Sequence, residues 1–182
     1  MRPTLIGFAA WSGTGKTTLL ETVVTRLQAR GLRVAVIKHA HHDFDIDHPG
    51  KDSHRLRQAG ARQVLVASRR RWALITEHDD GRPEPCLGEL LPQLDQAHLD
   101  FILVEGFKHA FIPKIELHRP ALGKPLLYPE DPSIIALAID APIAAQPAIP
   151  VLDLNDADAV CTFLLDYRVR ESARANAGQE TP

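Results

Sequence analysis

The chain has 182 residues, a formal net charge of -2 and 45% hydrophobic residues. This length suits one folded domain with a substantial core, and the near-neutral charge excludes a broadly basic surface for nucleic acid. No apolar run approaches the ~20 residues of a membrane span, and the N-terminal apolar stretch ends in a glycine-bearing loop, unlike a signal peptide. We therefore expect a cytoplasmic protein with neither nucleic acid nor membrane as a partner.

The first predicted element is a buried strand from Leu5 to Ala9, which runs into a turn ending in Gly15-Lys16-Thr17. This pattern is typical of a P-loop, in which backbone N–H groups face the phosphates. Its lysine reaches the β and γ oxygens, and the next hydroxyl ligates Mg²⁺. We predict a catalytic Lys16, a magnesium ligand in Thr17, and nucleotide contacts from Ser12, Gly13, Thr14, Gly15, Lys16, Thr17 and Thr18.

The loop departs from the usual G-x-x-x-x-G-K-[ST] pattern at its first position, where Ala10 stands. A positive φ there would cost roughly 1–2 kcal/mol, whereas a strand that simply continues through the position would tolerate the methyl group. We expect the second case. The alternative is an ordinary helix-capping turn with a solvated Lys16. The helical spacing of the apolar residues that follow favours the P-loop.

Further strands and helices alternate along the rest of the chain. After the first helix stops at Gly31, we expect strands at Arg33 to Lys38, Gln63 to Ala67, Trp72 to Thr76, Leu99 to Val104, Ile115 to Leu117, Ile134 to Ile139 and Ile149 to Leu152, and helices at Ser53 to Gln58, Leu87 to Leu94 and Ala157 to Leu165. Residues 171–182 contain almost no large apolar side chain and are predicted to be disordered. The predicted single domain therefore covers residues 1–170.

The alternation of strands with helices predicts an α/β fold. We expect a doubly wound, mainly parallel sheet of the P-loop NTPase type, flanked by helices. In such a fold the ligand lies at the carboxyl ends of the strands. Lys16, Lys38, Asp43 and Glu105 follow predicted strands directly or within a few residues. These side chains should therefore gather at one edge of the sheet.

Glu105 ends a continuous apolar run, where a P-loop protein carries the carboxylate that completes its magnesium shell. We predict that it is both a catalytic residue and a metal ligand, acting directly or through a metal-bound water. Gly106 could bring a backbone N–H close to the γ-phosphate. The competing interpretation of Glu105 is a solvated acid at the end of a strand.

Residues 38–48 contain four histidines and three aspartates. One interpretation is a switch loop whose acids address Mg²⁺ and the attacking water, with Asp43 as a catalytic residue and Asp45 as a metal ligand. A second is a transition-metal site, because imidazole and carboxylate suit such ions, and a third is a hydrated loop without a ligand. We favour the switch loop, since no H-x-x-x-H spacing fixes a metal cage.

Two segments of the sequence are candidates for recognising the nucleotide base. Asp140 follows a predicted strand and could accept hydrogen bonds from guanine. The segment most similar to the Asn-Lys-x-Asp pattern of guanine-specific proteins is Asn155-Asp156-Ala157-Asp158, but it lacks the lysine. Helix capping explains Asn155 or Asp156 at least as well. We take Asp140 as the candidate base contact.

Four segments together resemble the MobB family of molybdopterin-guanine dinucleotide biosynthesis proteins. They are Ala9-Ala10-Trp11-Ser12-Gly13-Thr14-Gly15-Lys16-Thr17-Thr18, Ile37 to Asp47 with Pro49 to Ser53, Val66-Ala67-Ser68 with Arg71 to Leu74, and Leu103 to His109. The resemblance implies a homodimeric P-loop protein that binds GTP and Mg²⁺ and has weak GTPase activity. It further implies an accessory role to the nucleotidyltransferase MobA, with molybdopterin or its guanine dinucleotide as a further partner.

Two other functions fit parts of the pattern. A small-molecule kinase could use the same P-loop and hold its acceptor with Lys51, Arg55 and Arg71. A metallochaperone GTPase could use the His39–His48 loop for its metal. Transfer of phosphate to an acceptor would indicate the kinase, and stoichiometric metal after dialysis would indicate the metallochaperone.

Overall fold

A computed structural model describes residues 2–40, 44–78, 81, 84–144 and 146–177. The chain divides into two compact units, one formed by residues 1–39 and 87–182 and the other by residues 40–86. Each unit is described by itself below. The prediction of one domain over residues 1–170 stays a prediction. Within the described ranges, no helix combines the length and the apolar character needed to cross a membrane.

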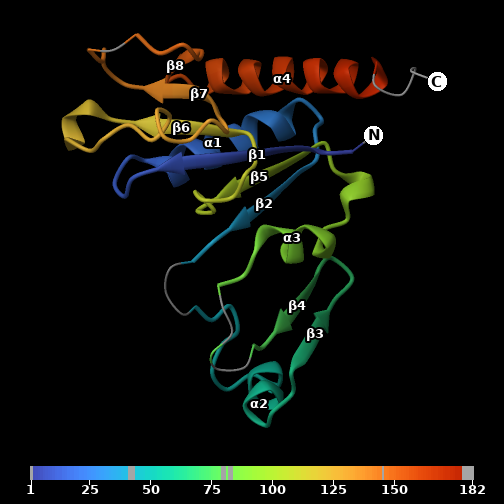
Figure 1. Ribbon diagram of the computed structural model, residues 1–182. Coiled ribbons are helices and arrows are strands. Elements are labelled where there is room, and N and C mark those ends of the chain that lie inside the picture. Colours follow the sequence, from blue (N-terminus) through green and yellow to red (C-terminus); the bar gives the residue numbers. More distant parts are fainter. Residues whose placement is uncertain (1, 41–43, 79–80, 82–83, 145, 178–182) are drawn as a thin grey trace. The chain divides into compact units, whose positions relative to one another are not determined.

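The first unit contains a six-stranded parallel sheet with the strand order β2-β5-β1-β6-β7-β8 (Figure 1). Its strands are β1 (Thr4–Ala10), β2 (Val34–Lys38), β5 (Phe101–Glu105), β6 (Lys114–His118), β7 (Ile134–Ile139) and β8 (Val151–Asp153). Strand β1 lies between β5 and β6, so the chain extends the sheet in both directions from its first strand. The carboxyl end of β1 is therefore the switch point where α/β folds place their ligands.

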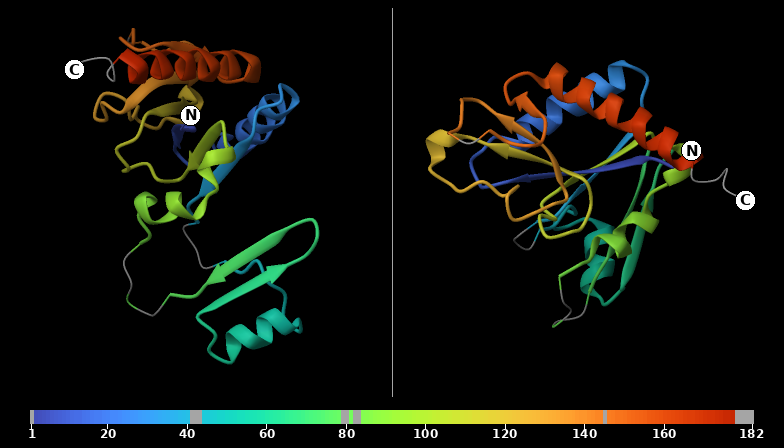
Figure 2. Two further views of the ribbon diagram at one scale, coloured as in Figure 1. Left: turned by 90° about the vertical axis from the view of Figure 1, so that its right-hand side faces the viewer. Right: turned by 45° about the horizontal axis from the view of Figure 1, so that its top comes forward.

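Helices cover both faces of this sheet, which confirms the predicted doubly wound α/β fold. The long helices α1 (Lys16–Ala29) and α4 (Ala157–Ala177) pack on one face, as Figure 2 shows, and share a core with β1, β5 and β6. The short helices α3 (Leu87–Leu90), η1 (Leu91–Gln93) and η2 (Gln96–His98) belong to the opposite side, where a second cluster contains Ile102 and Val104. Alternate residues of β5 thus serve the two cores, as expected for a strand buried on both faces.

Strand β6 differs from the other central strands because one of its faces is polar and buried. Ile115 and Leu117 join the main core, whereas Lys114, Glu116 and His118 alternate with them. Glu116 is 0% exposed and accepts hydrogen bonds from the backbone N–H groups of two residues in the β6–β7 connection, Leu127 and Tyr128. This connection contains only the short helix η3 (Pro120–Leu122), and polar anchors hold it to the sheet.

The second unit contains α2 (Asp52–Gln58) and an antiparallel hairpin of β3 (Gln63–Ala67) and β4 (Trp72–Thr76). Ser68 closes the turn, since its hydroxyl accepts hydrogen bonds from the N–H groups of Arg70 and Arg71. On one hairpin face Leu65 pairs with Leu74, next to Trp72, and all three side chains are exposed. The hairpin thus presents an apolar face within this unit.

Two local expectations can be compared with the structure. β1 continues through Ala10, which pairs with Leu117, and no described residue other than glycine has a positive φ. The expectation for Ala10 is therefore confirmed. Helix α4, in contrast, continues to Ala177 and includes residues 171–177, for which disorder was predicted. Alanine, arginine and glutamate favour helix, and Arg174 pairs with Glu171 one turn earlier. Residues 178–182 lie outside the described part.

Candidate functional site

The loop between β1 and α1 has the geometry of an anion cradle. Gly13 and Gly15 adopt φ values of +82° and +91°, which strain any residue with a Cβ. Gly15 caps α1 without any side-chain hydrogen bond to the first turn, so backbone N–H groups at this end stay available to a ligand. The Thr14 side chain is buried instead, and its hydroxyl donates to the carbonyl of Trp11 at 2.7 Å. This bond holds the loop closed.

Three predicted site residues meet beside this loop. The Thr17 hydroxyl donates to Glu105 Oε1 at 3.2 Å, and Lys16 Nζ lies 3.8 Å from the same oxygen. The other carboxylate oxygen lies 3.7 Å from Lys38 Nζ, at the end of β2. Glu105 is 8% exposed as a residue, so its negative charge sits between two ammonium groups with little contact to water. The carboxyl ends of β1, β2 and β5 therefore converge here, as the fold predicts.

Gly106 follows this carboxylate in a conformation that suits glycine alone. Its φ is +100°, and an added Cβ would lie 2.9 Å from His39 Cβ and 3.0 Å from the His39 carbonyl oxygen. The His39 N–H donates to the Glu105 carbonyl, and the His39 ring lies tilted against the Phe107 ring, with centroids 4.9 Å apart. The turn after β5 is thus packed closely against the residue that follows β2.

A buried lysine that the sequence analysis missed fixes the next part of this loop. Lys114 Nζ donates to the carbonyls of Lys108 and Ala110, both at 2.8 Å, and lies 2.7 Å from Asp131 Oδ2. Burial by itself raises the pKa of Asp131, but hydrogen bonds from Lys114 and Ser133 outweigh it and lower that pKa. The only sequence signal was a lysine beginning an apolar strand.

Arg119 is a second residue that the sequence analysis missed. Its Nε donates to the carbonyl of Thr14 in the P-loop at 2.8 Å, and its Nη1 lies 2.5 Å from Asp140 Oδ2. The other oxygen, Asp140 Oδ1, is buried and has no hydrogen-bond partner in the described part of the chain. Arg119 thus ties the phosphate loop to Asp140, the candidate base contact.

The competing base-recognition segment is occupied by structural contacts. Asp156 Oδ1 accepts hydrogen bonds from the N–H groups of Asp158 and Ala159, which caps the start of α4. Asp158 itself pairs with Arg26 and Arg30 on α1. These contacts agree with the helix-capping interpretation and favour Asp140 as the candidate.

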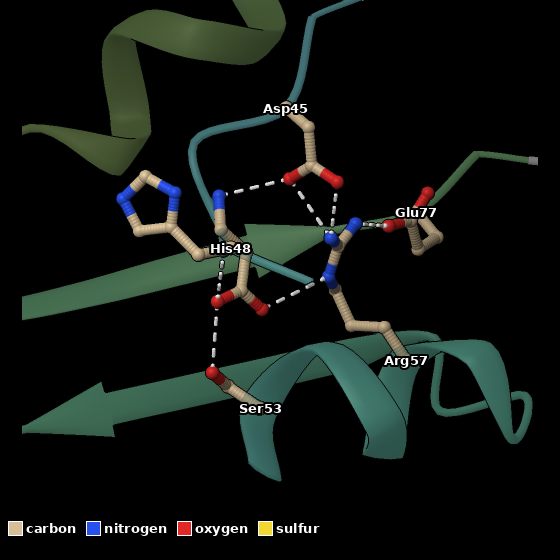
Figure 3. A network of polar contacts seen from close by, with 6 residues as sticks. Asp45, His48, Ser53, Arg57 and Glu77 are labelled. Carbon is tan, nitrogen blue, oxygen red and sulfur yellow. Dashed lines mark hydrogen bonds and ion pairs between the residues drawn. The ribbon is translucent and has the colours of Figure 1, made fainter. Parts of the chain in front are cut away.

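In the second unit, the histidine- and aspartate-rich segment is organised by Arg57 (Figure 3). This guanidinium, whose side chain is 8% exposed, pairs with Asp45, Asp47 and Glu77. The pKa of Asp45 is lowered by a hydrogen bond from the Asp47 N–H and by the bonds from Arg57. Asp47 also accepts a hydrogen bond from Ser53 at 2.9 Å. Both carboxylate oxygens of Asp45 thus already have a cationic partner.

Three of the predicted residues of this segment fall outside the part of the chain that the structure describes. Asp43, the predicted catalytic acid, and its neighbours His41 and His42 lie outside the described residues. In the part of the chain that is described, no group of three or more His, Cys, Asp or Glu side chains could hold a metal ion. The metal-binding role of Asp45 stays a prediction.

A comparison with family models and known proteins gives consistent matches. Residues 5–140 match MobB, described as molybdopterin guanine dinucleotide synthesis protein B. An Escherichia coli (strain K12) protein named molybdopterin-guanine dinucleotide biosynthesis adapter protein is 48% identical over 169 residues, covering 92% of this chain and 95% of that one. A Haemophilus influenzae protein of the same name is 44% identical over 165 residues, covering 90% and 88%.

Solved structures show the same fold. A MobB protein homolog from Bacillus stearothermophilus superposes with a TM-score of 0.68 at 24% identity, covering 91% of this chain and 98% of that chain. MobB from Bacillus subtilis gives a TM-score of 0.66 at 24% identity, with coverage of 89% and 96%. Together with the family match and the close relatives, the phosphate loop and its converging Glu105 lead to one assignment. This chain belongs to the MobB family of molybdopterin-guanine dinucleotide biosynthesis proteins.

Proposed function

We propose that this protein is a GTP-binding adapter of molybdopterin-guanine dinucleotide biosynthesis that hydrolyses GTP slowly. The observation that carries the proposal is the convergence of Lys16, Thr17 and Glu105 beside the N-terminus of α1, which has no side-chain cap. A helix terminus with free N–H groups, a lysine and a hydroxyl next to a carboxylate can hold phosphate oxygens and a divalent cation. The names of the close relatives supply the pathway.

The proposed roles of the site residues are as follows. Backbone N–H groups from Ser12 to Thr18 bind the phosphates, and Lys16 moves from Glu105 to the β and γ oxygens. The hydroxyl of Thr17 and the carboxylate of Glu105 present oxygens 3.2 Å apart, and oxygen ligands suit Mg²⁺. A bound Mg²⁺ neutralises charge that develops on the phosphates. We assign the N–H of Gly106 to the γ-phosphate, and Asp43, which lies outside the described residues, to the attacking water.

Guanine recognition is assigned to Asp140. Arg119 already pairs with Oδ2, so Oδ1 is the oxygen that would accept N–H groups from the base. A buried acceptor without a donor is costly, and a guanine edge would satisfy it. Because this oxygen is closed to solvent, base binding requires a local movement around Asp140.

The proposed assembly is a homodimer that works in the cytoplasm with a MobA-type nucleotidyltransferase and with molybdopterin or its guanine dinucleotide. The hairpin of the second unit supports a dimer, because Leu65 and Trp72 are 59% and 64% exposed. Among the described strands, β3 and β4 pair with each other alone. A two-stranded ribbon with an apolar face is marginal by itself and gains stability by packing or pairing.

The test is equilibrium binding of labelled GTP in the presence of Mg²⁺. Replacement Lys16→Ala removes a charge-assisted contact worth about 1.5–3 kcal/mol, which corresponds to an affinity loss of about 10- to 150-fold. Lys51→Ala is the matched control, since it removes the same charge from an exposed lysine outside the phosphate loop. Wild-type protein that ignores GTP, or a Lys16→Ala variant that binds it equally well, would contradict the proposal.

A further inference from the structure

We propose that Trp11, Lys108 and Lys124, together with Phe111, form a docking surface for an acidic protein partner. The Trp11 ring and the two ammonium groups are adjacent: Lys108 Nζ lies 5.4 Å from the centroid of the Trp11 ring, and Lys124 Nζ lies 5.9 Å from it. The residues come from the loops that follow β5, β6 and β1. This proposal rests on the proposed function, from which it takes the nucleotidyltransferase as the partner.

The Trp11 ring is held in place rather than free. Its indole N–H donates to the carbonyl of Pro125 at 2.8 Å, which joins the phosphate loop to the β6–β7 connection. The adjacent Thr14 hydroxyl and the Trp11 carbonyl close the same loop. A half-buried aromatic ring with a fixed orientation offers contact area at a small cost in conformational entropy, which is why tryptophan is enriched at energetic centres of interfaces.

The two lysines carry positive charge that no carboxylate among the described residues neutralises. Both side chains are exposed, and within the described residues neither forms an ion pair with a carboxylate. Each ammonium is attracted by the face of Trp11, so the two positive charges are held near one ring despite their mutual repulsion. Acidic side chains on a partner would relieve that repulsion. The complementary partner surface is therefore acidic, with an apolar group that packs on the ring.

The loop that carries Lys108 and Phe111 is also preorganised. Lys114 Nζ donates to the carbonyls of Lys108 and Ala110, and the N–H of Ala110 donates to the carbonyl of Phe107. On this fixed backbone the Phe111 side chain is 86% exposed. Binding through an ordered loop avoids the cost of ordering it. Phe111 is exposed three positions after Lys108 in the same loop, and an exposed phenylalanine favours a protein surface over a small anion, which would make no contact with the ring.

Two of the loops that form the docking surface also contain residues of the proposed phosphate site. Trp11 precedes the nucleotide-contacting residues, and Lys108 comes three positions after Glu105. Nucleotide binding to Lys16 and Glu105 would therefore act on the segments that carry the docking residues. An adapter whose docking surface is built from its nucleotide loops can report its loading state to the partner.

The experiment measures binding of the full-length chain, saturated with a non-hydrolysable GTP analogue and Mg²⁺, to the MobA-type nucleotidyltransferase of the same organism by calorimetry. The variants are the charge reversal Lys108→Glu with Lys124→Glu, the charge-preserving Lys108→Arg with Lys124→Arg, and Phe111→Ser. Arg2→Glu with Lys51→Glu is the matched control, because it changes the net charge equally at two exposed sites. Nucleotide affinity is measured for every protein, which verifies folding.

We expect the charge reversal to weaken partner binding at least tenfold and Phe111→Ser at least fivefold, while the arginine pair and the control stay within twofold of wild type. Charge reversal should also reduce the dependence of the affinity on salt concentration. Equal partner binding by wild type and the charge reversal overturns this inference and leaves the proposed function standing. Wild-type protein that binds GTP but not the nucleotidyltransferase overturns the proposed partner as well. Binding of a free pterin monophosphate is measured with the same variants. If charge reversal abolishes binding of this small anion but leaves binding of the protein partner unchanged, the surface is a small-anion site and the proposal is overturned.

Discussion

The hydroxyl of Thr17 lies 3.2 Å from Oε1 of Glu105, although 88 positions separate the two residues. The contact joins the first turn of α1, which follows β1 along the chain, to the end of β5, which pairs with β1 in the sheet. Hydroxyl and carboxylate oxygens at this spacing, with the Lys16 ammonium 3.8 Å away, form a local arrangement suited to a phosphate-bound cation. The proposed function depends on this pair.

The substitution Glu105→Gln is expected to weaken the effect of Mg²⁺ on GTP binding. The amide preserves the shape but removes the charge, and losing such a ligand or its neighbour typically costs about 10–100-fold in metal affinity. GTP affinity measured with Mg²⁺ and with a chelator gives the magnesium effect as a ratio. Glu130→Gln, at an exposed site, serves as the control. An unchanged ratio in Glu105→Gln would remove this residue from the metal site.

The substitution Gly106→Ala is expected to destabilise the protein more than Gly31→Ala does. Both glycines have positive φ, +100° and +78°, so each alanine pays roughly 1–2 kcal/mol of backbone strain. A Cβ at Gly106 would also meet His39 at 2.9 Å, whereas Gly31 has open space. Overpacking adds about 1–3 kcal/mol. Urea unfolding measures both variants, and equal losses would show that the contact with His39 relaxes without cost.

The substitution Lys114→Met is expected to cost about 3 kcal/mol of unfolding free energy, because it removes the cation that pairs with Asp131 and the donor to two backbone carbonyls, while Ser133 still donates to Asp131. Replacing Asp131 by asparagine in the same protein should recover part of the loss, since the unpaired negative charge is then gone. The double-mutant cycle from chemical denaturation gives the coupling energy. Strictly additive losses would mean that the ion pair is not the source of the effect.

The substitution Asp100→Asn is expected to make stability less dependent on pH in the acid range. The Arg33 N–H and the Arg168 guanidinium donate to this carboxylate and hold its pKa well below the ordinary 3.8. A depressed folded-state pKa gives stability that is present above pH 3.8 and is lost as the pH falls through the folded value. At pH 7 the unfolding free energy of the wild type should exceed that of the variant by about 2 kcal/mol.

That difference between wild type and Asp100→Asn should shrink steadily as unfolding is measured at lower pH, from 5 down to 2. Because other carboxylates titrate identically in both proteins, the difference isolates Asp100. A gap that stays constant over this range would show that ionisation of Asp100 does not contribute to acid stability.

The parts of the fold that follow local rules could be predicted from the sequence. The glycine pattern before Lys16 marks the phosphate loop because only glycine tolerates its left-handed turns, and the apolar run ending at Glu105 marks a buried parallel strand. A parallel sheet then brings both to one edge, as the structure shows. The helical character of residues 171–177 was missed, because the absence of large apolar side chains does not prevent alanine, arginine and glutamate from extending a helix.

The residues that support the site through hydrogen bonds and ion pairs could not be predicted in the same way. Lys114 and Arg119 act mainly on backbone carbonyls, and any residue supplies a carbonyl, so no sequence pattern identifies the partner. Arg57 pairs with three carboxylates from two segments of the chain, and a charge count alone cannot tell such an ion-pair cluster from a solvated loop. These contacts depend on the tertiary fold.

The most direct measurement of the central claim is a crystal structure of the protein with a non-hydrolysable GTP analogue and Mg²⁺. We expect the triphosphate in the loop between Ala10 and α1, with Lys16 on its terminal oxygens and the cation between Thr17 and Glu105. A nucleotide seated elsewhere, with this loop empty and Lys16 still paired to Glu105, would contradict it.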